Sequence, residues 1–327
     1  MGPELPAALR AAADRLLEGV SRRDLAQRAA RVSTTYRSGG TSAAAIGGAE
    51  DATAYVLSRL PATYAAAGAA LGEAQRMAPD FAPRSLLDAG AGPGGASWAA
   101  LEAWPDIAKA TLLDASRPFL EMARTLAQDG PSALRDAEFR RGDLVAEGAD
   151  WPKADLVITS YALAEIAPAH QARVVEALWS ACEGVLVIVE PGTPAGFSRV
   201  LAARETLIAA GGVVLAPCPH DAACPMTAPR WCHFVQRLPR SRDHRLAKEA
   251  DAPFEDEKFS YLAVARAGVR AAPRGPRILG PPRGAKPGLE FEVCAAEGIE
   301  RRFILKREKA AFSAVRRLRW GDAFPRF

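Results

Sequence analysis

Apolar residues recur every three or four positions through most of the first 80 residues, which is the pattern of amphipathic helices. Ser21 and Asp24 are spaced as in a capping box at the start of one such helix. The glycine-rich and serine-rich segment 34–48 interrupts the pattern and is expected to be a loop, and a second helical stretch follows over 49–77. The sequence therefore predicts an N-terminal helical region over residues 1–80.

From residue 85 the pattern changes to short apolar runs that alternate with amphipathic stretches of helical length. Runs such as SLLDAG, ATLLDAS and GVLVIVEPG are mostly apolar, which is typical of strands buried on both faces. Strands that alternate with helices in this way predict an α/β fold with a mostly parallel sheet covered by helices. We expect this domain to comprise residues 81–216 and 258–270.

Composition supports a globular protein, because 49% of the 327 residues are hydrophobic and 24% are charged. No apolar run approaches the roughly 20 residues that cross a bilayer, so we expect no membrane partner. The N-terminal sequence lacks the apolar core of a signal peptide and has too many acidic residues for a transit peptide. These features predict a cytoplasmic protein.

A glycine-rich turn, residues 90–95, lies between the first predicted strand and the next helix. Gly90, Gly92 and Gly95 form a G-x-G-x-x-G array, in which glycine lets the backbone turn sharply and approach a ligand. Asp88 precedes the turn, and Asp114 ends the following strand, where a carboxylate can accept hydrogen bonds from ribose hydroxyls. The pattern predicts a nucleotide site that suits a nicotinamide cofactor or S-adenosylmethionine.

The successive segments DAGAGPGG, LLDAS, RGDL and TSYALAEI resemble the motifs of class I methyltransferases. The resemblance implies a Rossmann-like class I sheet, S-adenosylmethionine as cofactor, and an acceptor segment, residues 160–166, facing the transferred methyl group. Tyr161 and Glu165 are the catalytic candidates in that segment, although no residue pattern marks a general base. The residues expected to hold the cofactor are Asp88, Gly90, Gly92, Gly94, Asp114, Asp143 and Ser160.

Three of the five cysteines fall in one proline-rich stretch, and a fourth lies near the C-terminal end. In a reducing compartment, clustered cysteines indicate a metal site before disulfides. Four thiolates suit zinc or a four-iron cluster, although the spacing is wider than the close pairs usual at zinc sites. His220 and His233 could replace a thiolate at a zinc site. The cysteines are Cys218, Cys224, Cys232 and Cys294.

The segments CPHDAACP, WCHF, EKFSYLAVAR and VCAAEG, with a basic end that includes WGDAF, resemble the methyltransferase-like assembly factors of the small ribosomal subunit. That family has mitochondrial members and bacterial homologues, and the likeness covers about residues 34–325. It identifies the chain as a bacterial homologue and implies a [4Fe-4S] cluster on the four cysteines, with His220 and His233 in supporting roles. It also implies the small subunit and its rRNA as partners, with a monomer away from the ribosome.

The basic segment, residues 301–327, has nine basic residues against Glu308 and Asp322, an excess that suits a polyanion. We expect residues 217–257 and 271–327 to form a cysteine-cluster insertion and a basic C-terminal extension. The nine basic residues are Arg301, Arg302, Lys306, Arg307, Lys309, Arg316, Arg317, Arg319 and Arg326.

Three functions fit these features. The first is methyl transfer from S-adenosylmethionine to small-subunit rRNA, which positioning alone could accelerate. The second is a factor that uses the same pocket without turnover and supports small-subunit assembly and translation. The third is a small-molecule methyltransferase with a structural zinc site, which leaves the basic segment unexplained.

Overall fold

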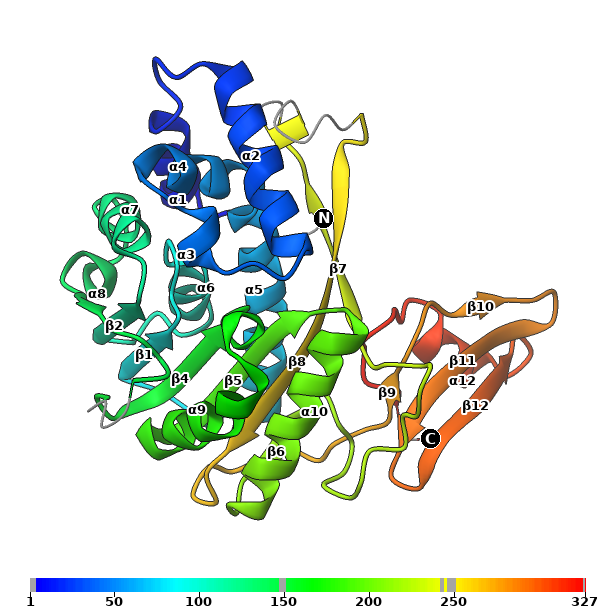
Figure 1. Cartoon of the computed structure of the whole chain (residues 1–327). Helices are drawn as coiled ribbons and strands as arrows, with labels where there is room; N and C mark the ends of the chain where they lie inside the picture. The colour runs from blue at the N-terminus through cyan, green and yellow to red at the C-terminus, as the bar shows by residue number, and fades with distance from the viewer. Residues whose placement is uncertain (1–3, 147–150, 242–243, 246–250, 326) are drawn as a thin grey trace.

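Figure 1 shows the computed structural model of the chain, which describes residues 4–146, 151–241, 244–245, 251–325 and 327. A central sheet flanked by helices forms the middle of the molecule. A layer of N-terminal helices lies at one end, and a smaller sheet projects on the C-terminal side. Among the described residues, no helix is both long enough and apolar enough to cross a membrane.

The N-terminal region is helical, as its periodicity predicts, but the segment 34–48, expected to be a loop, contains the end of one helix and a further short helix. The hydroxyl of Ser21 accepts a hydrogen bond from the backbone N–H of Asp24 at 3.3 Å, so the predicted cap begins a helix. The last N-terminal helix is rich in buried alanines, whose small side chains let it pack closely on the sheet and on the helix after the glycine-rich turn. The helices are α1 (Ala7–Arg15), α2 (Arg22–Arg37), α3 (Ser42–Ala45), α4 (Ala49–Ser58) and α5 (Leu60–Met77).

The central sheet contains the alternating strands that the apolar runs predict. Its longest parallel strand is also its most buried, because Val185 through Val189 are all 0% exposed, as expected for a strand covered on both faces. The strands are β1 (Ser85–Ala89), β2 (Lys109–Asp114), β3 (Glu138–Arg141), β4 (Ala154–Ser160), β5 (Cys182–Pro191), β6 (Val213–Ala216), β7 (Phe234–Pro239) and β8 (Phe254–Ala265).

The strand order is β3-β2-β1-β4-β5-β8-β6, with β1 to β5 parallel and β8 antiparallel to both of its neighbours. A Rossmann-like sheet with one antiparallel strand inserted before its last strand is the class I methyltransferase fold, so this part of the predicted fold class is confirmed, and the metal-cluster extension stays a prediction. The helices that connect and cover the strands are α6 (Gly95–Ala103), α7 (Arg117–Ala127), α8 (Ser132–Arg135), α9 (Pro168–Ala181) and α10 (Pro194–Ala209).

Strand β7 pairs with the first half of β8, so the two form a long antiparallel ribbon that rises beside the N-terminal helices (Figure 1). This pairing brings part of the segment 217–257 into the central sheet. Strand β7 is therefore attached to the main domain by backbone hydrogen bonds.

The C-terminal part forms a second, four-stranded sheet with its own core. Apolar side chains from one face of β11 pack against the last helix and against Phe324 near the end of the chain. The elements are β9 (Arg277–Ile278), β10 (Arg283–Gly284), β11 (Gly288–Ala295), β12 (Gly298–Leu305) and α12 (Lys309–Val315).

Candidate functional site

The glycine-rich turn joins β1 to α6 and requires glycine for two reasons. Gly90, Gly92 and Gly94 have φ values of +78°, +53° and +87°, in the left-handed region that side chains rarely adopt. A Cβ on Gly90 would lie 2.4 Å from the Cβ of Ala162 and 3.5 Å from Leu144. The turn therefore meets the loop after β3 and the acceptor segment after β4 in one place.

Asp88 lies beneath this turn and is fully buried. Its Oδ2 accepts a hydrogen bond from the Ser97 hydroxyl at 2.6 Å, whereas its Oδ1 has no hydrogen-bond partner among the described residues. Burial raises the pKa of Asp88 to about 7. An unpaired buried carboxylate oxygen beside a glycine-rich turn can accept a hydrogen bond from a ligand.

Asp114 ties the end of β2 to the glycine-rich turn. Its two carboxylate oxygens accept backbone N–H groups from Gly92 and Ser116, each at 2.7 Å. Burial raises its pKa, and each oxygen keeps a second lone pair that a ribose hydroxyl could use. Asp114, the residue predicted to bind the ribose hydroxyls, thus has a fixed orientation at the turn.

The two remaining cofactor candidates differ in their surroundings. Asp143 is exposed in the loop after β3, where it accepts the backbone N–H of Val145 at 2.9 Å. Ser160 ends β4, and its hydroxyl is buried without a hydrogen-bond partner in the described part of the chain.

Both catalytic candidates already form hydrogen bonds inside the protein. The Tyr161 hydroxyl donates to Glu257 on β8 at 2.7 Å, and Arg59 lies 3.7 Å from the same carboxylate oxygen. Glu165 accepts the backbone N–H of Ser42 at 2.6 Å. Tyr161 also has a φ of +62°, a strained conformation for a residue with a side chain.

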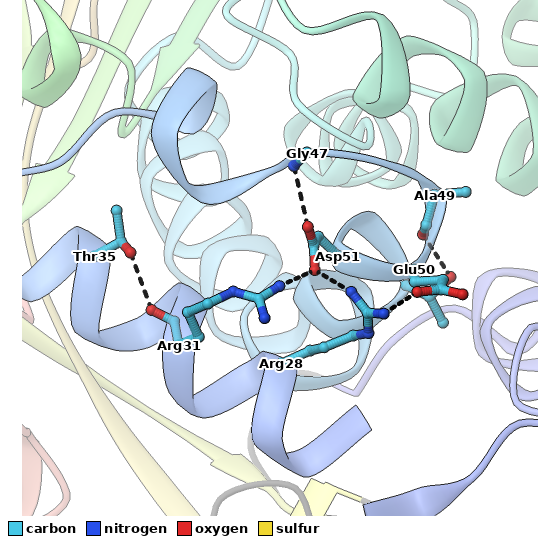
Figure 2. A network of polar contacts seen from close by, with 8 residues as sticks. Arg28, Arg31, Thr35, Gly47, Ala49, Glu50 and Asp51 are labelled. Atoms are coloured by element: carbon cyan, nitrogen blue, oxygen red, sulfur yellow. Dashed lines mark hydrogen bonds and ion pairs between the residues drawn. The ribbon is translucent and has the colours of Figure 1, made fainter. Parts of the chain in front are cut away.

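The Glu165 contact depends on how the N-terminal helices are fixed. Asp51 on α4 accepts hydrogen bonds from Arg28 at 2.9 Å, from Arg31 and from the backbone N–H of Gly47 at 3.1 Å (Figure 2). This network fastens α2 to α4 and holds the chain that follows α3. Ser42 at the start of α3 is thereby kept over the acceptor segment.

Aromatic side chains from three elements lie near the turn. Tyr55 on α4 is 6.0 Å from Tyr36 and 4.9 Å from Phe119 between ring centroids, in both cases edge to face. A Cβ added at Gly92 would lie 3.9 Å from Cδ2 of Phe119. The sequence predictions missed these residues, as they missed Arg59, Ser42 and Glu257.

The four predicted cysteines line one common pocket. They come from the segment between β6 and β7 and from β11, so the pocket joins the central sheet to the C-terminal sheet. Two ion pairs also join the segment between β6 and β7 to the C-terminal part of the chain. Arg274 binds both oxygens of Asp221 at 2.8 and 2.7 Å, and Arg230 binds Glu292 at 2.7 Å. The cysteines are Cys218, Cys224, Cys232 and Cys294.

The two histidines of this region have different roles. The Nε2 atom of His220 lies 3.9 Å from the Cys294 sulfur, so His220 borders the pocket. His233 instead packs with its ring stacked 5.2 Å from Trp231 and edge-on 4.7 Å from Trp320. Its position is that of a packing residue.

Among the described residues, no group of three or more His, Cys, Asp or Glu side chains is arranged to hold a single metal ion. Zinc with Zn–S bonds of about 2.3 Å would need sulfurs only about 3.8 Å apart. Burial and the neighbouring thiols raise the pKa of Cys232 well above its usual value, so without a metal it is protonated.

The basic segment is largely exposed. Lys309, Arg316 and Arg317 on and after α12 are exposed and form no ion pair within the described residues. Phe303 on β12 is 44% exposed. Arg326 lies outside the described residues.

Comparison with known proteins gives the family. The model of the family described as mitochondrial small ribosomal subunit Rsm22 matches residues 49–325, which include the glycine-rich turn and all four pocket cysteines. The chain belongs to the Rsm22 family. Rsm22 membership confirms the predicted kinship with small-subunit assembly factors. The iron–sulfur centre and the bacterial origin stay predictions.

The similar curated proteins are mitochondrial. The chain is 28% identical to the human mitochondrial ribosome assembly protein METTL17 over 83% of its own length and 62% of that protein. It is 24% identical to the Schizosaccharomyces pombe Rsm22-cox11 tandem proteins 1 and 2, both mitochondrial, covering 43% of each. The predicted cytoplasmic location is therefore wrong by this comparison, which points to mitochondria. The chain spans only about half of these relatives' lengths.

Solved methyltransferases resemble this chain more distantly. Magnesium protoporphyrin IX methyltransferase from Synechocystis is 14% identical with a TM-score of 0.41, covering 68% of this chain and 85% of that one. An S-adenosylmethionine-dependent methyltransferase from Mesorhizobium loti is 18% identical with a TM-score of 0.37, covering 59% and 95%. The fold assignment rests on the strand order above.

Proposed function

We propose that the protein is an S-adenosylmethionine-binding, methyltransferase-like factor that binds small-subunit rRNA and supports small-subunit assembly and translation. The observation that carries this proposal is the Rsm22 match, which spans the pocket, the cysteines and most of the basic segment. The name of the human relative, a ribosome assembly protein, supports the same reading.

The residues of the turn suit S-adenosylmethionine. The glycines leave room for a ligand beside the backbone, and Asp88 Oδ1 and Ser160 Oγ are buried polar atoms that lack partners in the described structure. Such orphaned atoms are costly unless a ligand or water pairs with them. We assign the cofactor contacts to Asp88, Gly90, Gly92, Gly94, Asp114, Asp143 and Ser160.

When bound, the cofactor would supply an electrophilic methyl group, and the protein's own residues would orient the acceptor and exclude water. Tyr161 and Glu165 form the wall nearest the acceptor. Their polar atoms are already bonded to Glu257 and Ser42, so each is placed to shape the pocket rather than to remove a proton. Binding and assembly are therefore the proposed primary role, and rRNA methylation is the activity if turnover occurs.

The cysteine pocket fits a [4Fe-4S] cluster better than one zinc ion. Four thiols line one pocket, the described residues form no site for a single metal ion, and a cluster offers a separate iron to each thiolate. When bound, the cluster would cross-link β11 to the segment between β6 and β7. Its binding energy would then stabilise the docking of the C-terminal sheet. The proposed ligands are Cys218, Cys224, Cys232 and Cys294.

RNA binding is assigned to the C-terminal sheet and α12. Exposed cations that lack protein carboxylate partners can pair with phosphates, and an exposed aromatic ring such as Phe303 can stack on an unpaired base. The cluster would hold this surface in a fixed position relative to the nucleotide pocket.

The test is sedimentation of the tagged protein through sucrose gradients, with crosslinking to identify the bound RNA. We expect the wild type to sediment with small-subunit particles and to crosslink to their rRNA. A variant with Arg316, Arg317 and Arg319 changed to glutamine should lose this association. The matched control changes the exposed Lys109, Arg117 and Arg124 of the main domain to glutamine and should retain the association. Free protein at the top of a low-salt gradient would contradict the proposal.

A further inference from the structure

Arg204 is a buried cation on α10, only 3% exposed. One of its terminal nitrogens donates to the backbone carbonyls of His220 and Ala222, both at 2.8 Å. Its Nε is buried and has no hydrogen-bond partner within the described structure. No carboxylate among the described residues forms an ion pair with it. Arg204 is therefore a buried guanidinium cation without an anionic partner among the described residues.

Neighbouring arginines differ from Arg204 in this respect. Arg277 is equally buried, and it pairs with Glu73 at 2.7 Å. Arg199, one turn earlier on α10, pairs with Glu190 at 2.5 Å. Each of these charges has a carboxylate beside it.

An unpaired buried charge is strongly destabilising, so the site implies a negative group that pairs with Arg204. Arg204 lines the same pocket as the four cysteines, and the pocket is otherwise mostly apolar. The carbonyls that Arg204 binds, those of His220 and Ala222, lie in the loop between Cys218 and Cys224, so the guanidinium is held beside the thiols. The missing negative group therefore belongs among the thiols.

Four thiolates around a cluster meet this need. They bring more negative charge than the cationic iron–sulfur core offsets, so the bound centre is anionic. Hydrogen bonds to the sulfurs and nearby charge are among the factors that set a cluster's reduction potential.

We propose that Arg204 is the counter-charge of the four-cysteine centre and donates its free Nε–H to a sulfur of that centre. The inference rests on the proposed cluster. Arg204 also fixes the carbonyls between Cys218 and Cys224, so it shapes the ligand loop as well as balancing its charge. A charge role and a purely structural role make different predictions for the loaded and cluster-free protein.

The experiment uses the full chain purified without oxygen, as wild type, Arg204→Met and Arg204→Lys. Methionine has a similar length without the charge, and lysine retains the charge without the Nε–H. Iron and sulfide are assayed first, and the midpoint potential is then measured by dithionite titration. The matched control is Arg230→Met, because Arg230 belongs to the same loop and is 48% exposed, so solvent screens its charge.

We expect Arg204→Met to shift the midpoint potential to more negative values, because a positive charge favours the reduced cluster. Arg204→Lys should show a smaller shift in the same direction, because it retains the charge and loses the Nε–H, and Arg230→Met should stay close to wild type. The melting temperature should fall more for Arg204→Met in the loaded protein than in protein stripped by a chelator, because only the loaded form contains the anion. A purely structural role would lower both melting temperatures equally.

The presence of the cluster and the role of Arg204 as its counter-charge are refuted by different results. Wild-type protein without iron and sulfide would overturn the cluster itself. Iron-loaded wild type and Arg204→Met with equal potentials would overturn the counter-charge while leaving the cluster in place. If Arg204→Met does not fold, Arg204→Lys decides: iron at the wild-type level supports the counter-charge, and a lysine variant without iron overturns it.

Discussion

Gly90→Ala tests whether the glycine-rich turn needs glycine because it packs closely against the acceptor segment. The added methyl carbon would lie 2.4 Å from the Ala162 methyl, where apolar carbons normally stay about 3.5–4.0 Å apart. Overpacking of this kind costs about 1–3 kcal/mol. The left-handed φ of +78° adds about 1–2 kcal/mol. We therefore expect the free energy of unfolding to fall by about 2–5 kcal/mol.

The matched control is Gly211→Ala. Gly211 has nearly the same φ, +80°, but nothing lies within 4 Å of an added Cβ. It should lose only the backbone cost of about 1–2 kcal/mol. Urea denaturation measures both variants, and calorimetry measures their affinity for S-adenosylmethionine, which only Gly90→Ala should reduce. Equal losses of stability in the two variants would refute the packing argument.

Three further predictions concern buried carboxylates. The folded pKa of Asp88 is about 7 and its ordinary value is 3.8, so its carboxyl lowers the free energy of unfolding as pH rises between about 4 and 7. Asp88→Asn should remove up to about 4 kcal/mol of that decline, measured by urea denaturation across pH. An unchanged pH profile would contradict this prediction. Asp114→Ala should abolish S-adenosylmethionine binding in calorimetry while circular dichroism stays native; full affinity would exclude Asp114 from the site. Asp51→Ala should lower the free energy of unfolding by about 1–3 kcal/mol, because Arg28 and the Gly47 N–H lose their shared acceptor, and a loss near zero would show that the network in Figure 2 is dispensable.

The fold could be predicted from the sequence wherever local periodicity determines structure. The run GVLVIVEPG became most of β5, which is buried from Gly184 to Glu190, and the alternation of strands and helices became the parallel half of the sheet. Pairing of β7 with β8 could not be predicted in this way. It depends on hydrogen bonds between strands separated by a long connection, and β7 itself mixes polar and apolar residues.

The candidate site shows the same division. Gly90 and Asp114 stand at fixed offsets from predicted strands, so a short motif locates them. The partners of Tyr161 and Glu165 lie 96 and 123 residues away in sequence, and no local pattern marks Glu257 or Ser42. The unpaired charge of Arg204 is likewise visible only once its surroundings are known.

The central claim is that four cysteines from two sheets bind one iron–sulfur centre. The most direct measurement is the iron, sulfide and zinc content of protein purified without oxygen, for wild type, Cys294→Ser and Cys182→Ser. Cys182 is a buried cysteine of β5 outside the pocket, so it controls for loss of any thiol. The account predicts about four irons per chain in wild type and Cys182→Ser, and loss of iron in Cys294→Ser. One zinc per chain, or iron retained in Cys294→Ser, would contradict it.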